Sequence, residues 1–109
     1  MTIHWLVLFV AVFTEIAWAL SLKAIQANPS VWVMAVSGVL TVLNMVLLSF
    51  AMRGIPVGTA YGVWTGLGAV GITIAGVIIY GDPMTTKRIA FLSLIIVGVV
   101  GLKFSGSEG

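Results

Sequence analysis

Residues 57–80 read VGTAYGVWTGLGAVGITIAGVIIY and contain no charged side chain. A helix rises about 1.5 Å per residue, so about 20 helical residues cross the hydrocarbon core of a bilayer, which is about 30 Å thick. This stretch is long enough to cross, and its recurring Gly residues are typical of helices that pack closely in lipid. We therefore expect residues 57–80 to form a transmembrane helix.

The composition of the whole chain has the same character. Of its 109 residues, 61% are hydrophobic and 7% are charged, whereas about a quarter of the residues of a soluble domain are charged. Too little polar surface remains to cover a water-soluble globule, which excludes soluble enzyme classes. The 5 basic residues form no patch for nucleic acid, and the lack of Cys excludes disulfides and thiolate metal sites. The composition predicts a membrane protein.

Three further apolar runs resemble the first in length, at residues 3–22, 30–52 and 88–104. All three Pro residues, Gly54, Gly81 and most of the charged residues lie between the runs, where water can satisfy the freed backbone groups. We therefore expect residues 1–109 to form a single four-helix transmembrane domain of the all-α class. One such subunit has little interior in which to enclose a substrate, so oligomerisation is expected. The expected breaks are Lys23 to Pro29, Arg53 to Pro56 and Gly81 to Arg88.

The basic residues are almost evenly divided between the two sides of the membrane. Arg53 and Lys103 fall on the side of the termini, and Lys23, Lys87 and Arg88 fall on the other. The positive-inside rule requires a clear Lys and Arg excess to fix an orientation. The balance predicts that copies insert both ways, and the alternative is that Lys87 and Arg88 together still fix one orientation.

Glu15 is the one charged residue expected deep inside a span, about 18 Å along the first helix by helical rise. An ionised carboxylate in hydrocarbon costs several kcal/mol, so such acids usually face a cavity or a partner and mark ion or proton pathways. No basic residue of the other spans lies deep enough to pair with it. Glu15 is therefore expected to bind a proton or an external cation, and the alternative is a structural Glu bonded to a neighbouring helix.

Aromatic residues accompany this carboxylate at helical spacing. Trp18 follows Glu15 by three residues, and Tyr61 and Trp64 are three apart on the third span, so each pair shares a helix face. Aromatic faces attract cations, and Tyr O–H and Trp N–H groups can orient a carboxylate. We therefore expect these side chains to line a cation site. Trp5 and Trp32, near segment starts, are expected in the interfacial belts.

Helical depth suggests that the site needs two copies. By helical rise Trp64 lies about 10 Å into its span and Glu15 about 18 Å into its own, so within one copy they miss by about 8 Å. An inverted second copy would bring its Trp64 to about 20 Å on the same scale. This estimate favours an antiparallel dimer.

Small residues predict where helices pack. Gly58, Gly62 and Gly66 recur every fourth residue along the third span, and Gly98 and Gly101 are three apart in the fourth. Such stripes allow backbones to approach closely in lipid. We expect the first set to pack against neighbouring helices and the second to meet another copy, although packing within one subunit is the alternative.

Polar residues elsewhere add little chemistry. Asn44 and Thr41, in the second span, are expected to hydrogen-bond to Glu15, to a substrate or only to backbone. His4 is expected to be a solvated terminal residue, and Lys23 is expected to end the first helix, where a cation suits the helix dipole. A phosphate loop, a nucleophile with its base and a metal-ligand cluster are all missing from the sequence, so we expect no enzyme, no metal and no cofactor.

At these residues the chain resembles the small multidrug resistance family, and within it the guanidinium-exporter subtype. The resemblance covers nearly the whole chain, and Trp18 in particular is similar to the guanidinium subtype. Asn44 stands where that subtype usually carries Ser. The matching motifs are EIAWALSLK at residues 15–23, PVGTAYGVWTGLGA at 56–69 and GVVGLK at 98–103.

The resemblance implies a proton-coupled antiporter of four helices per subunit, working as an antiparallel dimer in the bacterial inner membrane. It implies export of guanidinium or small substituted guanidinyl cations, with Glu15 as the shared proton and substrate site. An identical copy is the expected partner, and a homologous subunit is possible. The alternatives are a broad quaternary-ammonium exporter and a non-transporting subunit of a paired exporter. By the resemblance the site is lined by Trp18, Tyr61 and Trp64.

Overall fold

The computed structural model describes residues 2–105 as four helices joined by short turns. All four helices are long and apolar enough to cross a membrane, and residues 2–105 contain no strand. The prediction of an all-α chain with four candidate spans is confirmed. The helices are α1 (Ile3–Ala27), α2 (Val31–Ala51), α3 (Val57–Tyr80) and α4 (Thr86–Ser105).

The end of α1 differs from the expected one, because the helix continues through Lys23 to Ala27. Lys23 is accommodated inside the helix since its long stem carries Nζ to 5.7 Å from the centre of the Tyr80 ring on α3. The helix ends instead at Asn28, where φ is −151°. Asn28 precedes Pro29, and a proline disfavours helical dihedrals in the residue before it. Proline, rather than the charge of Lys23, sets this boundary.

The α3–α4 connection shows two local devices that end and start a helix. Gly81 closes α3 with φ of 69°, the left-handed conformation that glycine adopts without steric cost. The Thr85 hydroxyl then accepts the backbone N–H of Arg88 at 3.2 Å, which satisfies a free donor at the helix start. As a result α4 begins at Thr86, two residues before the expected start of residues 88–104.

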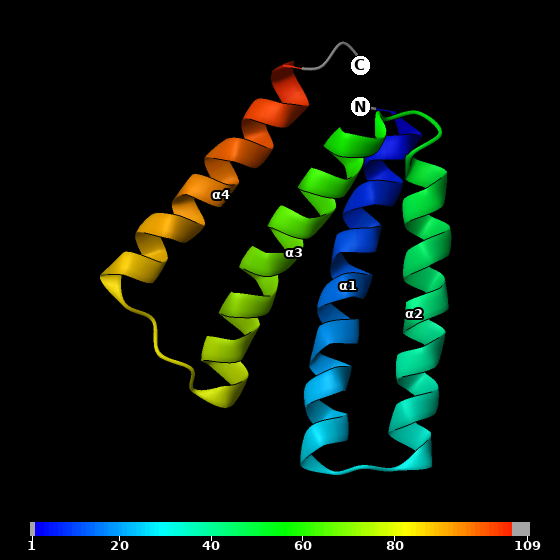
Figure 1. Cartoon of the computed structure of the whole chain (residues 1–109), viewed down its shortest axis with the longest axis vertical. Helices are drawn as coiled ribbons and strands as arrows, with labels where there is room; N and C mark the ends of the chain where they lie inside the picture. Colours follow the sequence, from blue (N-terminus) through cyan, green and yellow to red (C-terminus); the bar gives the residue numbers. More distant parts are fainter. Residues whose placement is uncertain (1, 106–109) are drawn as a thin grey trace.

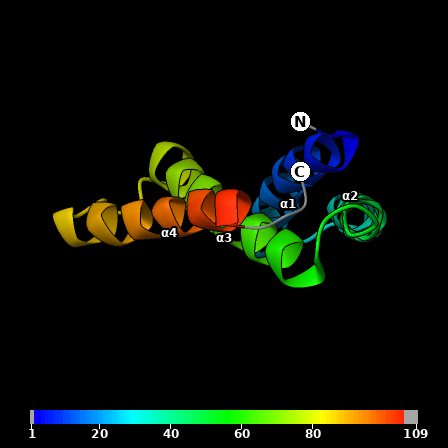
Figure 2. The same cartoon turned by 90° about the horizontal axis from the view of Figure 1, so that it is seen from above.

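The helices spread into a slab of 45 × 35 × 18 Å. α1 packs against both α2 and α3, and the α4 backbone lies beside that of α3 alone, at the outer edge of the slab in Figure 1, while its Lys103 side chain reaches the Trp5 ring of α1. Seen from above, the helices form one shallow layer and do not close around a centre (Figure 2). The start of α1, the end of α4 and the α2–α3 turn lie at one end (Figure 1), which we call the terminal end.

The best-packed core lies at the terminal end of the slab and draws residues from all four helices and the α2–α3 turn. Trp5 belongs to this core and is 1% exposed, so the expectation that it lies in an interfacial belt is wrong. Its helix face is shared with Leu8, one turn later, and both turn inward. Trp32 is 78% exposed, as a belt residue would be. The core consists of Trp5, Leu8, Ala51, Ile55, Ala60, Val63 and Val99.

Candidate functional site

Glu15 lies at the midpoint of α1 and is half-buried. Helical rise puts it about 18 Å from either end of that helix. Its Oε1 atom is buried and has no hydrogen-bond partner among the described residues. A buried polar atom without a partner is unfavourable, and more so for a carboxylate in lipid. The structure therefore presents a carboxylate whose bonding is incomplete in the single chain.

Gly68 on α3 is what allows the carboxylate to lie where it does. A Cβ placed on Gly68 would overlap Glu15 Oε1 and would stand 2.6 Å from Glu15 Cδ. Any larger residue at position 68 would therefore displace the Glu15 side chain. The absence of a side chain lets the carboxylate rest directly on the α3 backbone.

Two further contacts set the register between α1 and α3. The Trp64 indole N–H donates to the Ala11 carbonyl oxygen at 3.2 Å, one turn before Glu15. Gly71 meets Ile16, whose Cγ1 atom would lie 3.1 Å from a Cβ at position 71. Trp64 therefore approaches the Glu15 helix within one chain, about 6 Å along the axis from the level of Glu15 by helical rise.

A small polar network joins three helices beside Glu15. The Thr14 hydroxyl on α1 lies 2.9 Å from the Ala11 carbonyl oxygen and also contacts Asn44 Oδ1 on α2. A hydroxyl has one proton, so both contacts are satisfied together when the Asn44 amide turns its NH₂ group toward Thr14. Ala11 also accepts the Trp64 N–H. The network fixes α1, α2 and α3 one turn from the carboxylate.

Asn44 is buried, at 6% exposure, and its hydrogen bond in the structure goes to Thr14, next to Glu15 in the chain. Thr41, the other polar residue expected near the carboxylate, instead donates to the Ser37 carbonyl oxygen at 2.9 Å. The second span thus sends one polar side chain toward α1 and satisfies the other within its own backbone.

The aromatic residues expected at the site lie on two helices. The Tyr61 and Trp64 rings are 5.6 Å apart at 51°, and Tyr61 is 53% exposed. Trp18 is half-buried, one turn after Glu15 on α1. Because Ala11 already uses the Trp64 N–H, what Trp64 can offer to a cation is its ring face.

The glycines expected at packing faces fall into two groups. Gly62 and Gly66 face α4, with would-be Cβ atoms 3.0 Å from Leu102 Cδ1 and 2.9 Å from Val99 Cγ2. Apart from the adjoining backbone of the same helix, no described atom lies within 4 Å of a Cβ built on the other three. The second group therefore presents open, close-approach surface on α3 and α4. Its members are Gly58, Gly98 and Gly101.

The described part of the chain has few side chains of the types that bind metal ions. Residues 2–105 contain no group of three or more His, Cys, Asp or Glu side chains that could hold a metal ion. The site's one acidic side chain is Glu15, which lies against Gly68 and next to the Thr14–Asn44 pair, with Trp18 one turn further along α1.

Comparison with known proteins gives this geometry a context. The family profile described as Small Multidrug Resistance protein matches residues 3–95, which include Glu15, Asn44 and the α3 residues of the site. This chain belongs to the Small Multidrug Resistance protein family. The resemblance predicted from the sequence is confirmed.

Relatives within the Small Multidrug Resistance family are similar along almost their whole length. The chain is 40% identical over 101 residues to proteins named guanidinium exporter from Escherichia coli K12 and from Proteus vulgaris. A guanidinium exporter of Salmonella typhimurium is 40% identical over the same length. In each case the match covers 93% of this chain and 96% or 97% of the relative. With four candidate spans, family membership makes the chain a multi-pass protein of the bacterial inner membrane.

Sequence reasoning missed three residues that build the site of this family member. Thr14 carried a signal, since a hydroxyl beside an intramembrane Glu in the chain is placed to link helices. Gly68 stood in a glycine-rich stretch, but the sequence does not say which glycine meets the carboxylate. Ala11 contributes only its carbonyl oxygen, which no residue type reveals.

Proposed function

We propose that this chain exports guanidinium or small substituted guanidinyl cations in exchange for protons. The observation that carries the proposal is the buried, unpartnered Oε1 of Glu15 at the midpoint of a candidate membrane span. Support comes also from relatives named guanidinium exporter that match over 93% of the chain. Glu15 is the shared binding site for the proton and the substrate.

The proton and the cation are exchanged because they compete for the same carboxylate. An unneutralised carboxylate in hydrocarbon costs several kcal/mol, so the empty, ionised site rarely reorients across the membrane. Either a proton or a cation neutralises Glu15, and the two cannot occupy it together. Each time the site reorients, it therefore carries either the proton or the cation that bound on the side it leaves. A proton gradient across the membrane then drives the cation outward.

Geometry favours a guanidinyl group over other cations. The planar guanidinium ion presents a fork of N–H donors that matches a carboxylate bidentately, whereas a quaternary ammonium has no donor. Its flat faces suit the rings of Trp18 and Trp64, since the Trp64 N–H is bonded to Ala11. Tyr61 lies 5.6 Å from Trp64 and extends this aromatic wall. Asn44 completes the site by holding Thr14 beside the carboxylate.

The working unit of this proposal is an antiparallel dimer. A slab 18 Å thick is less than two helix diameters, at about 10 Å each, so it encloses no compartment. A second, inverted copy supplies the missing wall. The open faces at Gly98 and Gly101 on α4 suit close contact with the matching helix of that copy.

Single cysteines test the dual insertion that such a dimer requires, because the natural chain has no Cys. Ala27→Cys and Ser105→Cys place exposed thiols at opposite ends of the subunit. An impermeant maleimide added outside cells should label about half of the copies of each variant. Labelling of one variant alone would contradict dual insertion.

Reconstitution of the purified chain into liposomes tests the transport itself. Guanidinium added outside should drive proton movement in wild type, and Glu15→Gln should abolish it while eluting as a folded protein in detergent. Preferential exchange of tetramethylammonium would instead assign the chain to the broad quaternary-ammonium exporters. Exchange that appears only with a homologous subunit added would make it half of a paired system. Coupled exchange by Glu15→Gln would refute the mechanism.

A further inference from the structure

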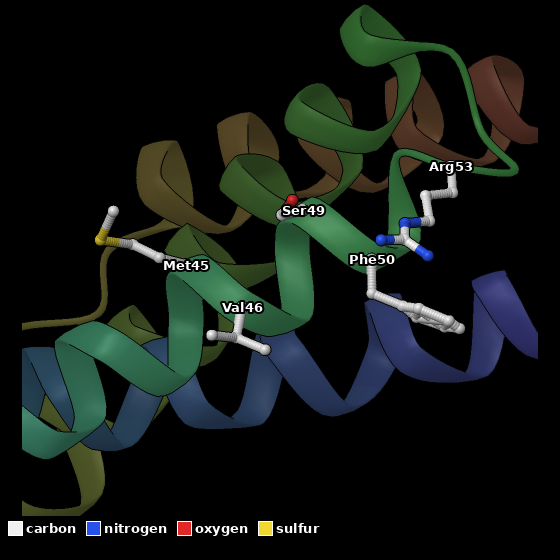
Figure 3. Close-up of a pocket in the computed structure, with 5 residues that line it drawn as sticks. All are labelled: Met45, Val46, Ser49, Phe50 and Arg53. Carbon is white, nitrogen blue, oxygen red and sulfur yellow. The ribbon is translucent and has the colours of Figure 1, made fainter.

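A second recognition surface lies away from Glu15, on the exposed side of α2 at the terminal end. It is a cavity of about 560 Å³ along the last two turns of α2 and the start of the following turn. Met45 and Val46 are 67% and 59% exposed, so this face of the helix is open to its surroundings. The cavity is lined by Met45, Val46, Ser49, Phe50 and Arg53 (Figure 3).

The terminal end of this cavity carries positive charge. Figure 3 shows Arg53 turned back over the last turn of α2, and its Cζ lies 5.9 Å from the centre of the Phe50 ring. His4, expected to be a solvated terminal residue, is half-buried with its ring 5.3 Å from that of Phe50. His4 lies in the first turn of α1, which has no acidic residue and no side-chain cap. A helix N-terminus adds partial positive charge.

The described carboxylates do not reach this charge. Glu15 lies at the midpoint of α1, and Asp82 follows α3 at the opposite end of the slab, beside Gly76. Arg53 therefore lines the cavity, and within residues 2–105 no acidic side chain pairs with its N–H donors. Five N–H groups in a planar fork suit a phosphate particularly well.

The cavity matches the depth of one bilayer leaflet. Arg53 lies two residues beyond α2, at the level of the headgroups, and Met45 lies about 12 Å deeper by helical rise. A second cavity of about 590 Å³ shares Val46 and continues to Leu43 and beyond. One leaflet contributes half of the roughly 30 Å core, which reaches Leu43 from Arg53. The surface is thus cationic at the headgroup level and apolar along one leaflet.

We propose that this face of α2 binds one anionic phospholipid of the surrounding leaflet. The phosphate bonds to Arg53 near the first turn of α1, and an acyl chain lies along Val46 and Met45. The match of a cationic headgroup level with an apolar face one leaflet deep points to a phospholipid, and an inverted second copy, whose Asp82 would stand at the level of Arg53, is the other outcome of the test below. The proposal does not depend on what the protein transports.

Native mass spectrometry of the full chain, released from vesicles of equal dioleoyl phosphatidylglycerol and dioleoyl phosphatidylcholine, tests this site. Wild type should retain the anionic lipid with about a fivefold preference, the effect expected for one basic side chain at an anionic surface. Arg53→Gln should remove most of that preference, and Arg53→Lys should keep it. Lys87→Gln is the matched control, because it removes one charge at the opposite end and lines none of the cavities described above.

Equal retention of the two lipids by wild type would overturn the proposal. So would an equal loss of preference in Lys87→Gln and Arg53→Gln, since general surface charge would then account for it. A second copy on the same face, inverted as proposed above, would bring its exposed Val31, five helical turns from Ser49 on the same side of α2, close to the level of Ser49. Copies carrying Ser49→Cys are therefore mixed with copies carrying Val31→Cys in the same vesicles: the lipid predicts little disulfide between them, and efficient disulfide formation would replace the lipid by a second subunit.

Discussion

Replacing Gly68 by Ala should move the Glu15 carboxylate while changing the stability of the protein little. A Cβ at position 68 would stand 2.6 Å from Glu15 Cδ, whereas ordinary contacts begin at 3.4 Å. The Glu15 carboxylate must therefore retreat by about 1 Å. Where reacting groups are held in a defined geometry, a displacement of about 1 Å can cost about 100-fold in rate. We expect a loss of that order in guanidinium-driven proton exchange.

Folding should change much less than transport in Gly68→Ala. Alanine favours a helix over glycine by about 1 kcal/mol, and moving Glu15 off a preferred rotamer costs about 0.5–1.5 kcal/mol. These two effects nearly cancel in the free energy of unfolding. A matched control is Gly58→Ala on the same helix, because a Cβ there meets no described atom within 4 Å beyond the adjoining helix backbone.

The assay is proton flux into liposomes that contain equal amounts of each variant, with guanidinium added on one side. Thermal unfolding in detergent, measured in parallel, reports whether each variant is folded. Gly58→Ala should exchange within about twofold of wild type. A wild-type exchange rate for Gly68→Ala would refute the reasoning, because the carboxylate would then work from a displaced position.

Three further outcomes follow from the structure. Asn44→Ser should slow exchange but leave guanidinium preferred over tetramethylammonium in transport competition, because Asn44 acts through Thr14; a changed ranking would place Asn44 against the substrate. Trp5→Phe should lower the free energy of unfolding in detergent by about 1 kcal/mol, because the cavity left by the smaller ring and the weakened Lys103 contact outweigh the removal of a buried N–H without a partner; higher stability would contradict this. Gly66→Val should push Val99 and α4 away from α3 and so reduce chemical cross-linking between the α4 helices of two copies. Unchanged cross-linking would contradict this and show that α4 keeps its place in the dimer.

The sequence was sufficient for the elements and for the central carboxylate. Apolar run length predicted four helices, since backbone groups in lipid must bond within their own segment. Glu15 was recognisable because charge inside a span is rare. The predicted end of α1 at Lys23 was wrong, because a long Lys stem can extend along the helix surface while its charge stays outside. Here the Lys23 ammonium lies beside the Tyr80 ring.

Residue partners were harder to predict because they depend on the angle between helices. Trp5 carries the residue type of an interfacial belt, but its helix face turns into the core at the terminal end. The α1–α3 register brings Gly68 to Glu15 and Trp64 to Ala11, and no periodicity in either helix fixes that register. An apolar pattern predicts which segments lie in the membrane. It does not predict which residues of two neighbouring helices touch, because several candidate partners are equally apolar.

The core at the terminal end has a consequence for how the chain is made. It unites Trp5 of the first helix with Val99 of the last, and Lys103 Nζ lies 4.5 Å from the Trp5 ring. The first helix to enter the membrane thus completes its packing only after the fourth has followed. A chain that stops after α3 would leave Trp5 without Val99 and Lys103, and we expect membrane proteases to recognise it as unfinished.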